Sequence, residues 1–135
     1  MSDEKAGRSA LARLRIVMVE TSHPGNIGAA ARAMKNMSLE HLYLVRPKAF
    51  PHPDAFARAS GAHDRLDRAV ICASLPEALT GCCHVYGASA RLRAYDWPQI
   101  DARQCAAQAL AVAEQEPVAI VFGREDSGLG NEEMA

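Results

Sequence analysis

Two glycine-bearing segments, each following an apolar run, carry the residues of this chain that could do chemistry. The first holds Asn26 and Arg32 in the spacing Asn-x-Gly-x-x-x-Arg. The second has the spacing Gly-x-Glu-x-x-Gly-Leu, formed by Gly123, Glu125 and Gly128. Glycine lets the backbone approach a ligand closely because no Cβ intervenes. A guanidinium pairs with phosphate, and a carboxylate accepts hydrogen bonds from hydroxyl and amide groups. The pattern predicts a ligand-binding site with charged groups in it.

The first segment should run from a strand into an amphipathic helix. An apolar run at residues 14–19 ends shortly before Pro24, and the residues after it repeat at helical spacing. One face of this helix is apolar, with Ile27, Ala30, Ala31 and Met34. Arg32 falls roughly opposite that face and is predicted to point toward a ligand. Asn26 is either the helix N-cap or a polar contact in the site, and the two roles are compatible.

Short apolar runs alternate with helical stretches along the chain, which predicts an α/β fold with a parallel sheet and helices on both faces. Functional loops in such sheets lie at the carboxyl ends of the strands. The predicted strands are residues 14–19, 41–45, 69–73, 83–87 and 118–122.

Local signals place the remaining helices. Ser74 and Glu77 have the spacing of a capping box, and Gly81 is a stop signal after it. Asp101 can cap a longer helix that ends before Pro117. Prolines and glycine in residues 46–64 predict a loop around one short helix.

Length and composition predict one domain. The chain has 135 residues, and 49% of them are apolar, enough for a single core. We expect residues 1–13 to be a flexible polar segment and residues 14–135 to be the domain. No apolar run could span a bilayer or act as a signal sequence, so the expected location is cytoplasmic. The cysteines show no metal-binding spacing and are expected to be buried free thiols, with no metal site.

A net charge of -1 gives no global support for nucleic-acid binding, so any RNA contact must be local. The candidate cations are Arg32, Lys35, Arg46, Lys48, Arg91 and Arg93. For each of these, apart from Arg32, a solvated surface charge is the leading interpretation. A dinucleotide fingerprint and a P-loop are both absent, which disfavours a Rossmann-type oxidoreductase or an ATP site.

The two motifs resemble motifs one and two of the SPOUT methyltransferases. The stretches VETSHPGNIG, ARAMKNM, GASAR, WP and VFGRE-x-x-GL-x-NEE occur in the order found in bacterial tRNA (cytidine/uridine-2'-O-)-methyltransferases. The resemblance covers the chain from Leu14 onward and implies a SPOUT α/β-knot fold that works as a homodimer. It implies S-adenosylmethionine-dependent 2'-O-methylation of cytidine or uridine in the tRNA anticodon loop.

The resemblance also assigns roles to individual residues. Arg32 would act on the ribose hydroxyl, by anchoring a phosphate and stabilising charge on oxygen rather than as a literal base. Asn26 would share the catalytic site with it. Glu125 and Lys35 would contact the substrate. The positions that match cofactor contacts are Ala88, Ser89, Ala90, Gly123 and Gly128.

The family has a third motif, rich in Ser, Leu and Asn, in the C-terminal knot, and here the sequence ends at Ala135. We therefore expect the knot segment to be missing from this chain, with weak cofactor binding as the result. The alternative function is a non-catalytic nucleotide- or RNA-binding module on the same fold.

Overall fold

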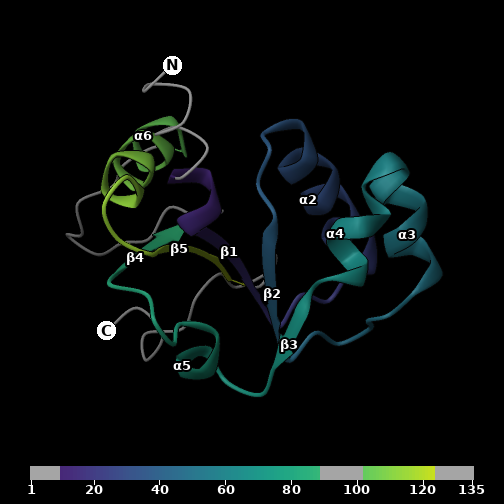
Figure 1. Cartoon of the computed structure of the whole chain (residues 1–135). Coiled ribbons are helices and arrows are strands. Elements are labelled where there is room, and N and C mark those ends of the chain that lie inside the picture. The colour runs from purple at the N-terminus through teal and green to yellow at the C-terminus, as the bar shows by residue number, and fades with distance from the viewer. Residues whose placement is uncertain (1–9, 89–101, 124–135) are drawn as a thin grey trace.

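A computed structural model describes residues 10–88 and 102–123, with side chains for residues 10–87 and 108–123. Its centre is a parallel sheet of five strands in the order β3-β2-β1-β5-β4 (Figure 1). The strands are β1 (Leu14–Val19), β2 (His41–Val45), β3 (Val70–Cys72), β4 (His84–Ala88) and β5 (Val118–Phe122). The predicted bounds of β1, β2 and β5 are confirmed. Strand β3 is shorter than predicted, and β4 is shifted by one residue.

The helices are α2 (Pro24–Asn36), α3 (Pro53–Ala59), α4 (His63–Asp67), α5 (Leu75–Ala78) and α6 (Ala102–Ala113), with a 3-10 turn η1 at Ser60–Ala62. The prediction of one short helix within residues 46–64 is therefore wrong, because α3, η1 and the start of α4 all lie there. Prolines mark the start of this region rather than break it: Pro53 is the first residue of α3, where its missing N–H costs nothing.

Side chains of alternate strand residues point to opposite faces of the sheet and belong to two separate hydrophobic cores. Ile16 pairs with Leu42 and Ile120 in register, and this row packs under α2, α3, α4 and α6. Val17 and Val121 point to the other face, where α5 covers them together with neighbouring side chains. Figure 1 shows α2, α3 and α4 grouped together and α5 apart from them. Helices on both faces of a parallel sheet are thus confirmed.

Helices α2 and α3 meet at unusually close range. A Cβ added to Gly28 would lie 2.0 Å from the carbonyl oxygen of Ala55 and 2.8 Å from the Cβ of Arg58. Ala55 and Ala59 are fully buried in the same contact. Small residues on both helices therefore let the backbones touch, and we call this contact the α2/α3 seam.

Helix α5 is short and is held from both ends. Ser74 Oγ accepts a hydrogen bond from the Glu77 N–H at 3.3 Å, which confirms the capping interaction. Glu77 reaches back and accepts from the Ala73 N–H at 2.8 Å. At the other end, Arg15 donates to the carbonyl oxygens of Ala78 at 2.6 Å and Thr80 at 3.0 Å. A helix too short to stand alone is thereby fixed to β1.

Residues 10–13 form a turn of helix that leads into β1. Ala10 is 3% exposed and belongs to the larger core. Arg13 donates to the carbonyl oxygens of Ala113 at 2.9 Å and Glu114 at 3.0 Å, at the end of α6. The rest of the N-terminal segment expected to be flexible, residues 1–9, lies outside the described residues.

Candidate functional site

The residues that directly follow β1 and β2 adopt a left-handed backbone conformation and hydrogen-bond to the neighbouring strand. Glu20 has φ 50° and Arg46 has φ 46°, backbone angles that residues other than glycine seldom adopt. Their N–H groups donate to Val45 O at 2.8 Å and Cys72 O at 3.0 Å. Backbone strain of this kind tends to gather at functional sites. The strained edge is the one where parallel sheets bind ligands.

Arg46, a candidate for RNA contact, makes local contacts at this edge. Its guanidinium lies 3.7 Å from the Glu20 carboxylate and donates to Ala73 O at 3.4 Å. The side chain is half exposed. Arg46 therefore links the ends of β1 and β3. Because its guanidinium is already paired, it is less available to bind a ligand.

Helix α2 begins at Pro24, directly after this edge, with His23 as its N-cap residue. Asn26 is therefore the third residue of the helix, and the N-cap prediction for Asn26 is wrong. The reason is that Pro24, with its fixed φ, is suited to the first helical position. Asn26 instead lines a pocket between α2 and α3.

Arg32 is exposed on α2, as predicted. The buried residues of the helix are Ile27, Gly28, Ala31 and Met34. Because Gly28 is buried in the seam, the buried face of α2 includes the side toward α3. Arg32 therefore lies beside the buried face, on the side of α3, and not opposite that face as predicted. Among the described residues, no hydrogen bond or ion pair engages the Arg32 guanidinium. Its charge is available to a ligand.

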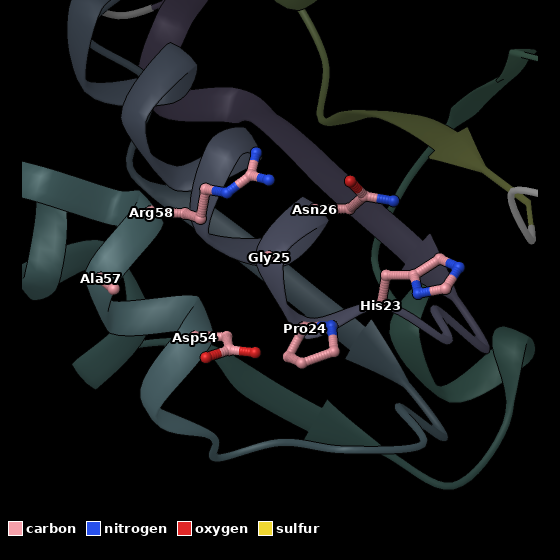
Figure 2. Close-up of a pocket in the computed structure, with 7 residues that line it drawn as sticks. All are labelled: His23, Pro24, Gly25, Asn26, Asp54, Ala57 and Arg58. Carbon is pink, nitrogen blue, oxygen red and sulfur yellow. The ribbon is translucent and has the colours of Figure 1, made fainter.

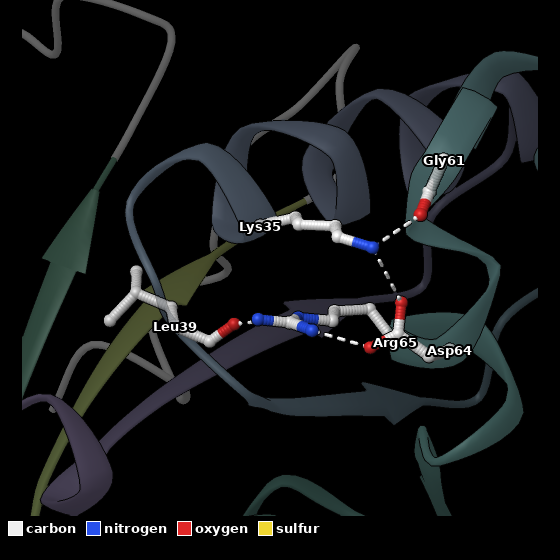
Figure 3. Close-up of polar contacts among 5 residues, drawn as sticks. All are labelled: Lys35, Leu39, Gly61, Asp64 and Arg65. Carbon is white, nitrogen blue, oxygen red and sulfur yellow. Dashed lines mark hydrogen bonds and ion pairs between the residues drawn. The ribbon is translucent and has the colours of Figure 1, made fainter.

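Lys35, predicted to contact substrate, is tied to the protein itself (Figure 3). Its Nζ donates to Gly61 O at 2.6 Å and lies 3.6 Å from Asp64 Oδ1. Arg65, nearly buried, pairs with Asp64 and donates to Leu39 O at 3.0 Å. The hydrogen bond from Arg65, helped by the positive charges of Arg65 and Lys35, holds the pKa of Asp64 below its ordinary value, although burial opposes it. This cluster joins α2 to η1 and α4.

The pocket between α2 and α3 has a volume of about 460 Å³ (Figure 2). Its lining residues are His23, Pro24, Gly25, Asn26, Asp54, Ala57 and Arg58. Asp54 and Arg58 were missed by the sequence analysis. They belong to no motif, and only the close seam brings α3 against the start of α2.

The structure brings two predicted cofactor positions together at neighbouring strand ends. Ala88 ends β4 and pairs in register with Phe122, the last residue of β5, which Gly123 follows. Ser89, Ala90, Glu125 and Gly128 lie outside the described residues, as do Arg91 and Arg93.

Cys72, Cys82 and Cys83 are free thiols, as predicted, but only Cys72 of these three is buried, since Cys82 is half-buried and Cys83 is exposed. The side chain of Cys105 lies outside the described part of the chain. Burial raises the pKa of the Cys72 thiol. In the described part of the chain, no three His, Cys, Asp or Glu side chains gather to hold a metal ion. Nor does any helix described there have the length and hydrophobicity to cross a membrane.

Comparison with known proteins gives consistent matches. The SpoU rRNA Methylase family matches residues 13–135. Over 92% of the chain, the sequence is 58% identical to the tRNA (cytidine/uridine/adenosine-2'-O-)-methyltransferase TrmJ of Pseudomonas aeruginosa strain UCBPP-PA14. It is 52% identical, again over 92% of the chain, to the tRNA (cytidine/uridine-2'-O-)-methyltransferase TrmJ of Escherichia coli strain K12. The chain spans about half the length of these relatives, 49% and 50%.

Solved structures agree with the sequence matches. A probable methyltransferase from Bordetella pertussis Tohama I superposes with a TM-score of 0.82 and 41% identity, over 93% of this chain and 78% of that one. AviRb from Streptomyces viridochromogenes, solved in complex with the cofactor AdoMet, has a TM-score of 0.60 at 17% identity, over 88% of this chain and 46% of that one. The second likeness shows a shared fold.

Proposed function

The chain belongs to the SpoU methylase family, and from this premise we propose that it transfers a methyl group from S-adenosylmethionine to a ribose 2'-hydroxyl of tRNA. The names of the relatives with 52–58% identity support this reaction. The tRNA substrate supports a cytoplasmic location. The observation that carries the proposal for this chain is Arg32, exposed and without a partner among the described residues, on the helix that leaves the carboxyl end of β1.

Arg32 suits the chemistry of an oxygen nucleophile. A guanidinium stays protonated at neutral pH, so it cannot serve as the base. As the O–CH3 bond forms, the S–CH3 bond of the cofactor breaks to release S-adenosylhomocysteine, and the hydroxyl proton passes to solvent water. It can hold the phosphate next to the reacting ribose and stabilise negative charge that develops on the 2'-oxygen. Holding that oxygen in line with the methyl group lowers the barrier without a covalent intermediate. Asn26, on the same helix, would orient the ribose by hydrogen bonding.

The residues at the ends of β4 and β5 suit S-adenosylmethionine, which when bound supplies an electrophilic methyl group. Ala88 and Gly123 have little or no side chain, and the register puts the two strand ends side by side. A small ligand could therefore approach the backbone closely at these two positions, because no large side chain intervenes. Ser89, Ala90 and Gly128 would complete the cofactor site, and Glu125 would hold substrate hydroxyls.

The substrate we propose is the anticodon loop of tRNA, at cytidine or uridine. The name of the P. aeruginosa relative adds adenosine. A panel of anticodon stem-loops that differ only in the target base, incubated with labelled S-adenosylmethionine, decides which bases are accepted. RNA binding without methyl incorporation on any base would favour the alternative, a non-catalytic RNA-binding module.

Arg32→Ala tests the mechanism. Methyl transfer should fall by at least 100-fold, as for loss of one group that stabilises transition-state charge. The melting temperature should stay unchanged because the side chain is exposed. Arg68→Ala is the control, since Arg68 is also exposed and belongs to neither motif. An active Arg32→Ala variant would remove Arg32 from the mechanism.

We also propose that the protein acts as a homodimer in which α2 of one subunit approaches the cofactor loops of the other. The surface around Arg32 would then be part of a self-complementary contact. Mixing an Arg32→Ala variant with a variant altered at Gly123 should restore activity through hybrid dimers. No rescue, with mixed dimers present by mass, would mean that each site is complete within one chain.

A further inference from the structure

We propose that Arg58 of α3 binds a backbone phosphate of the RNA substrate, next to the nucleotide that Arg32 contacts. This inference rests on the proposed RNA-modifying function and adds a residue that belongs to neither motif. It concerns the pocket between α2 and α3.

The position of Arg58 is set by the seam. A Cβ added to Gly25 would lie 3.5 Å from Cγ and 3.6 Å from Nε of Arg58, ordinary contact distances. The arginine therefore lies along the first turns of α2, where glycine leaves room for it. Figure 2 shows its guanidinium turned toward α2 and away from the carboxylate of Asp54.

Arg58 keeps its charge available in spite of a nearby carboxylate. Asp54 precedes Arg58 by four residues on α3, a spacing that favours an ion pair. The Asp54 carboxylate lies instead beside His52, with Oδ2 3.8 Å from the Nδ1 atom that accepts the Asp54 N–H at 3.0 Å. Within the described part of the chain, the Arg58 guanidinium has no hydrogen bond or ion pair.

Arg58 is one of three cations along the seam. With about 3.6 residues per turn, Gly25, Gly28, Arg32 and Lys35 form one stripe of α2 that faces α3. Lys35 is committed to Gly61 and Asp64. Arg32 and Arg58 remain, and Arg32 lies only one turn, about 6 Å, beyond Gly28. Two uncommitted guanidinium groups on one seam suit two phosphates of the same RNA strand.

The cofactor is not the ligand that this arginine suits. S-adenosylmethionine has a carboxylate but no phosphate, and its proposed site is at the ends of β4 and β5. Helix α3 packs on α2, on the side of the sheet that carries β2 and β3, away from β4 (Figure 1). Because the protein carries a net charge of -1, RNA affinity must come from local cations such as this pair.

Asp54 limits the pocket to a single phosphate. Its carboxylate lines the same cavity, and its side chain is 71% exposed. A second phosphate would meet this negative charge. Replacing Asp54 by Asn should therefore tighten RNA binding, whereas loss of Arg58 should weaken it.

The test measures binding of a fluorescent anticodon stem-loop to the full chain by anisotropy at several salt concentrations. Arg58→Gln should weaken binding about tenfold and lower the slope of log Kd against log salt by about 0.7, the value for one phosphate contact on a single strand. Asp54→Asn should strengthen binding. Arg68→Gln, at an exposed position that does not line this pocket, should match the wild type. The S-adenosylmethionine affinity of Arg58→Gln should be unchanged.

Neutral methylphosphonates, placed one at a time along the loop, identify the phosphate. One position should weaken wild-type binding about tenfold and have no further effect in Arg58→Gln, because the two changes remove the same contact. If Arg58→Gln bound the RNA with the affinity and salt slope of the wild type, and still methylated it, this inference would be overturned and the proposed function would stand. A wild-type chain that neither binds nor methylates the RNA would overturn both.

Discussion

Gly28 shows how one residue sets the distance between two helices. In an exposed helix, alanine is favoured over glycine by about 1 kcal/mol. At Gly28 the added Cβ would lie 2.0 Å from a backbone oxygen, which no side-chain rotation can relieve. We expect Gly28→Ala to lower the free energy of unfolding by about 1–3 kcal/mol, the usual cost of overpacking.

Gly61→Ala is the matched control for this prediction. A Cβ added there meets nothing within 4 Å, and the carbonyl that accepts from Lys35 is retained. Its free energy of unfolding should stay the same or rise by up to about 1 kcal/mol. Urea titrations of the wild type, Gly28→Ala and Gly61→Ala compare their free energies of unfolding. Equal stability of the two variants would show that the seam is not tightly packed.

Asp64 should make stability depend on pH in the acid range. Its folded pKa is lowered, chiefly by the hydrogen bond from Arg65. The contribution of the carboxylate is therefore complete above its unfolded pKa, about 3.9, and is lost as the pH falls through the lower folded value. Asp64→Asn should remove this part of the acid dependence.

Urea unfolding between pH 6 and pH 3 checks the prediction for Asp64. Relative to the wild type, Asp64→Asn should be less stable at pH 6, and the difference should shrink as the pH falls. Asp67→Asn, at an exposed position on the same helix, is the control. Its free energy of unfolding should change between pH 6 and pH 3 by the same amount as that of the wild type. A constant gap between Asp64→Asn and wild type would contradict the role assigned to the Asp64 carboxylate.

At the scale of single residues, motif spacing predicted the exposure of Arg32 but not the partners of Lys35. Those partners, Gly61 and Asp64, are distant in sequence, and no local rule places them near α2. Arg58 was missed for the same reason. Its position depends on a helix crossing made possible by Gly28, a residue without a side chain and hence without a hydrophobic signal.

At the scale of elements, α5 is held by a side chain from elsewhere in the chain. Arg15 on β1 donates to two carbonyls at the carboxyl end of α5, and its guanidinium lies 4.2 Å from the ring centre of Tyr43. We expect Arg15→Ala to lower the free energy of unfolding by about 1–3 kcal/mol, since carbonyl groups lose charged donors. Arg68→Ala, measured by the same urea titration, should change little. An unchanged free energy of unfolding in Arg15→Ala would mean that the Ser74 cap and the burial of Leu75 and Ala78 are enough to hold α5.

The elements themselves were largely predictable because their signals are local. Strands β1, β2 and β5 are apolar runs with polar borders, and the Ser74 cap follows from its spacing to Glu77. The stretch from Pro53 to Asp67 was harder. Its helices are short, with five to seven residues each, so they lack the repeated periodicity that marks a helix in sequence.

Across the whole molecule, the protection of backbone amides against hydrogen exchange should follow the order of strands in the sheet. Strand β1 pairs with both β2 and β5, and Val17 is fully buried. Strand β3 has three residues and pairs with β2, and Val70 and Ile71 are 43% and 53% exposed. Amide exchange measured by mass spectrometry should be slowest in β1 and at least tenfold faster in β3. Similar rates in both strands would indicate that the sheet opens only as one unit.

The seam between α2 and α3 also has a consequence in time. Backbones in contact at Gly28 and Ala55 leave no free volume for the helices to slide, and close-packed contacts of this kind transmit strain instead of absorbing it. The two helices should therefore move as one body on the microsecond scale. Encounter with a charged partner on this surface would then proceed without a slow rearrangement of the helices, and its rate would be set by diffusion and electrostatic steering.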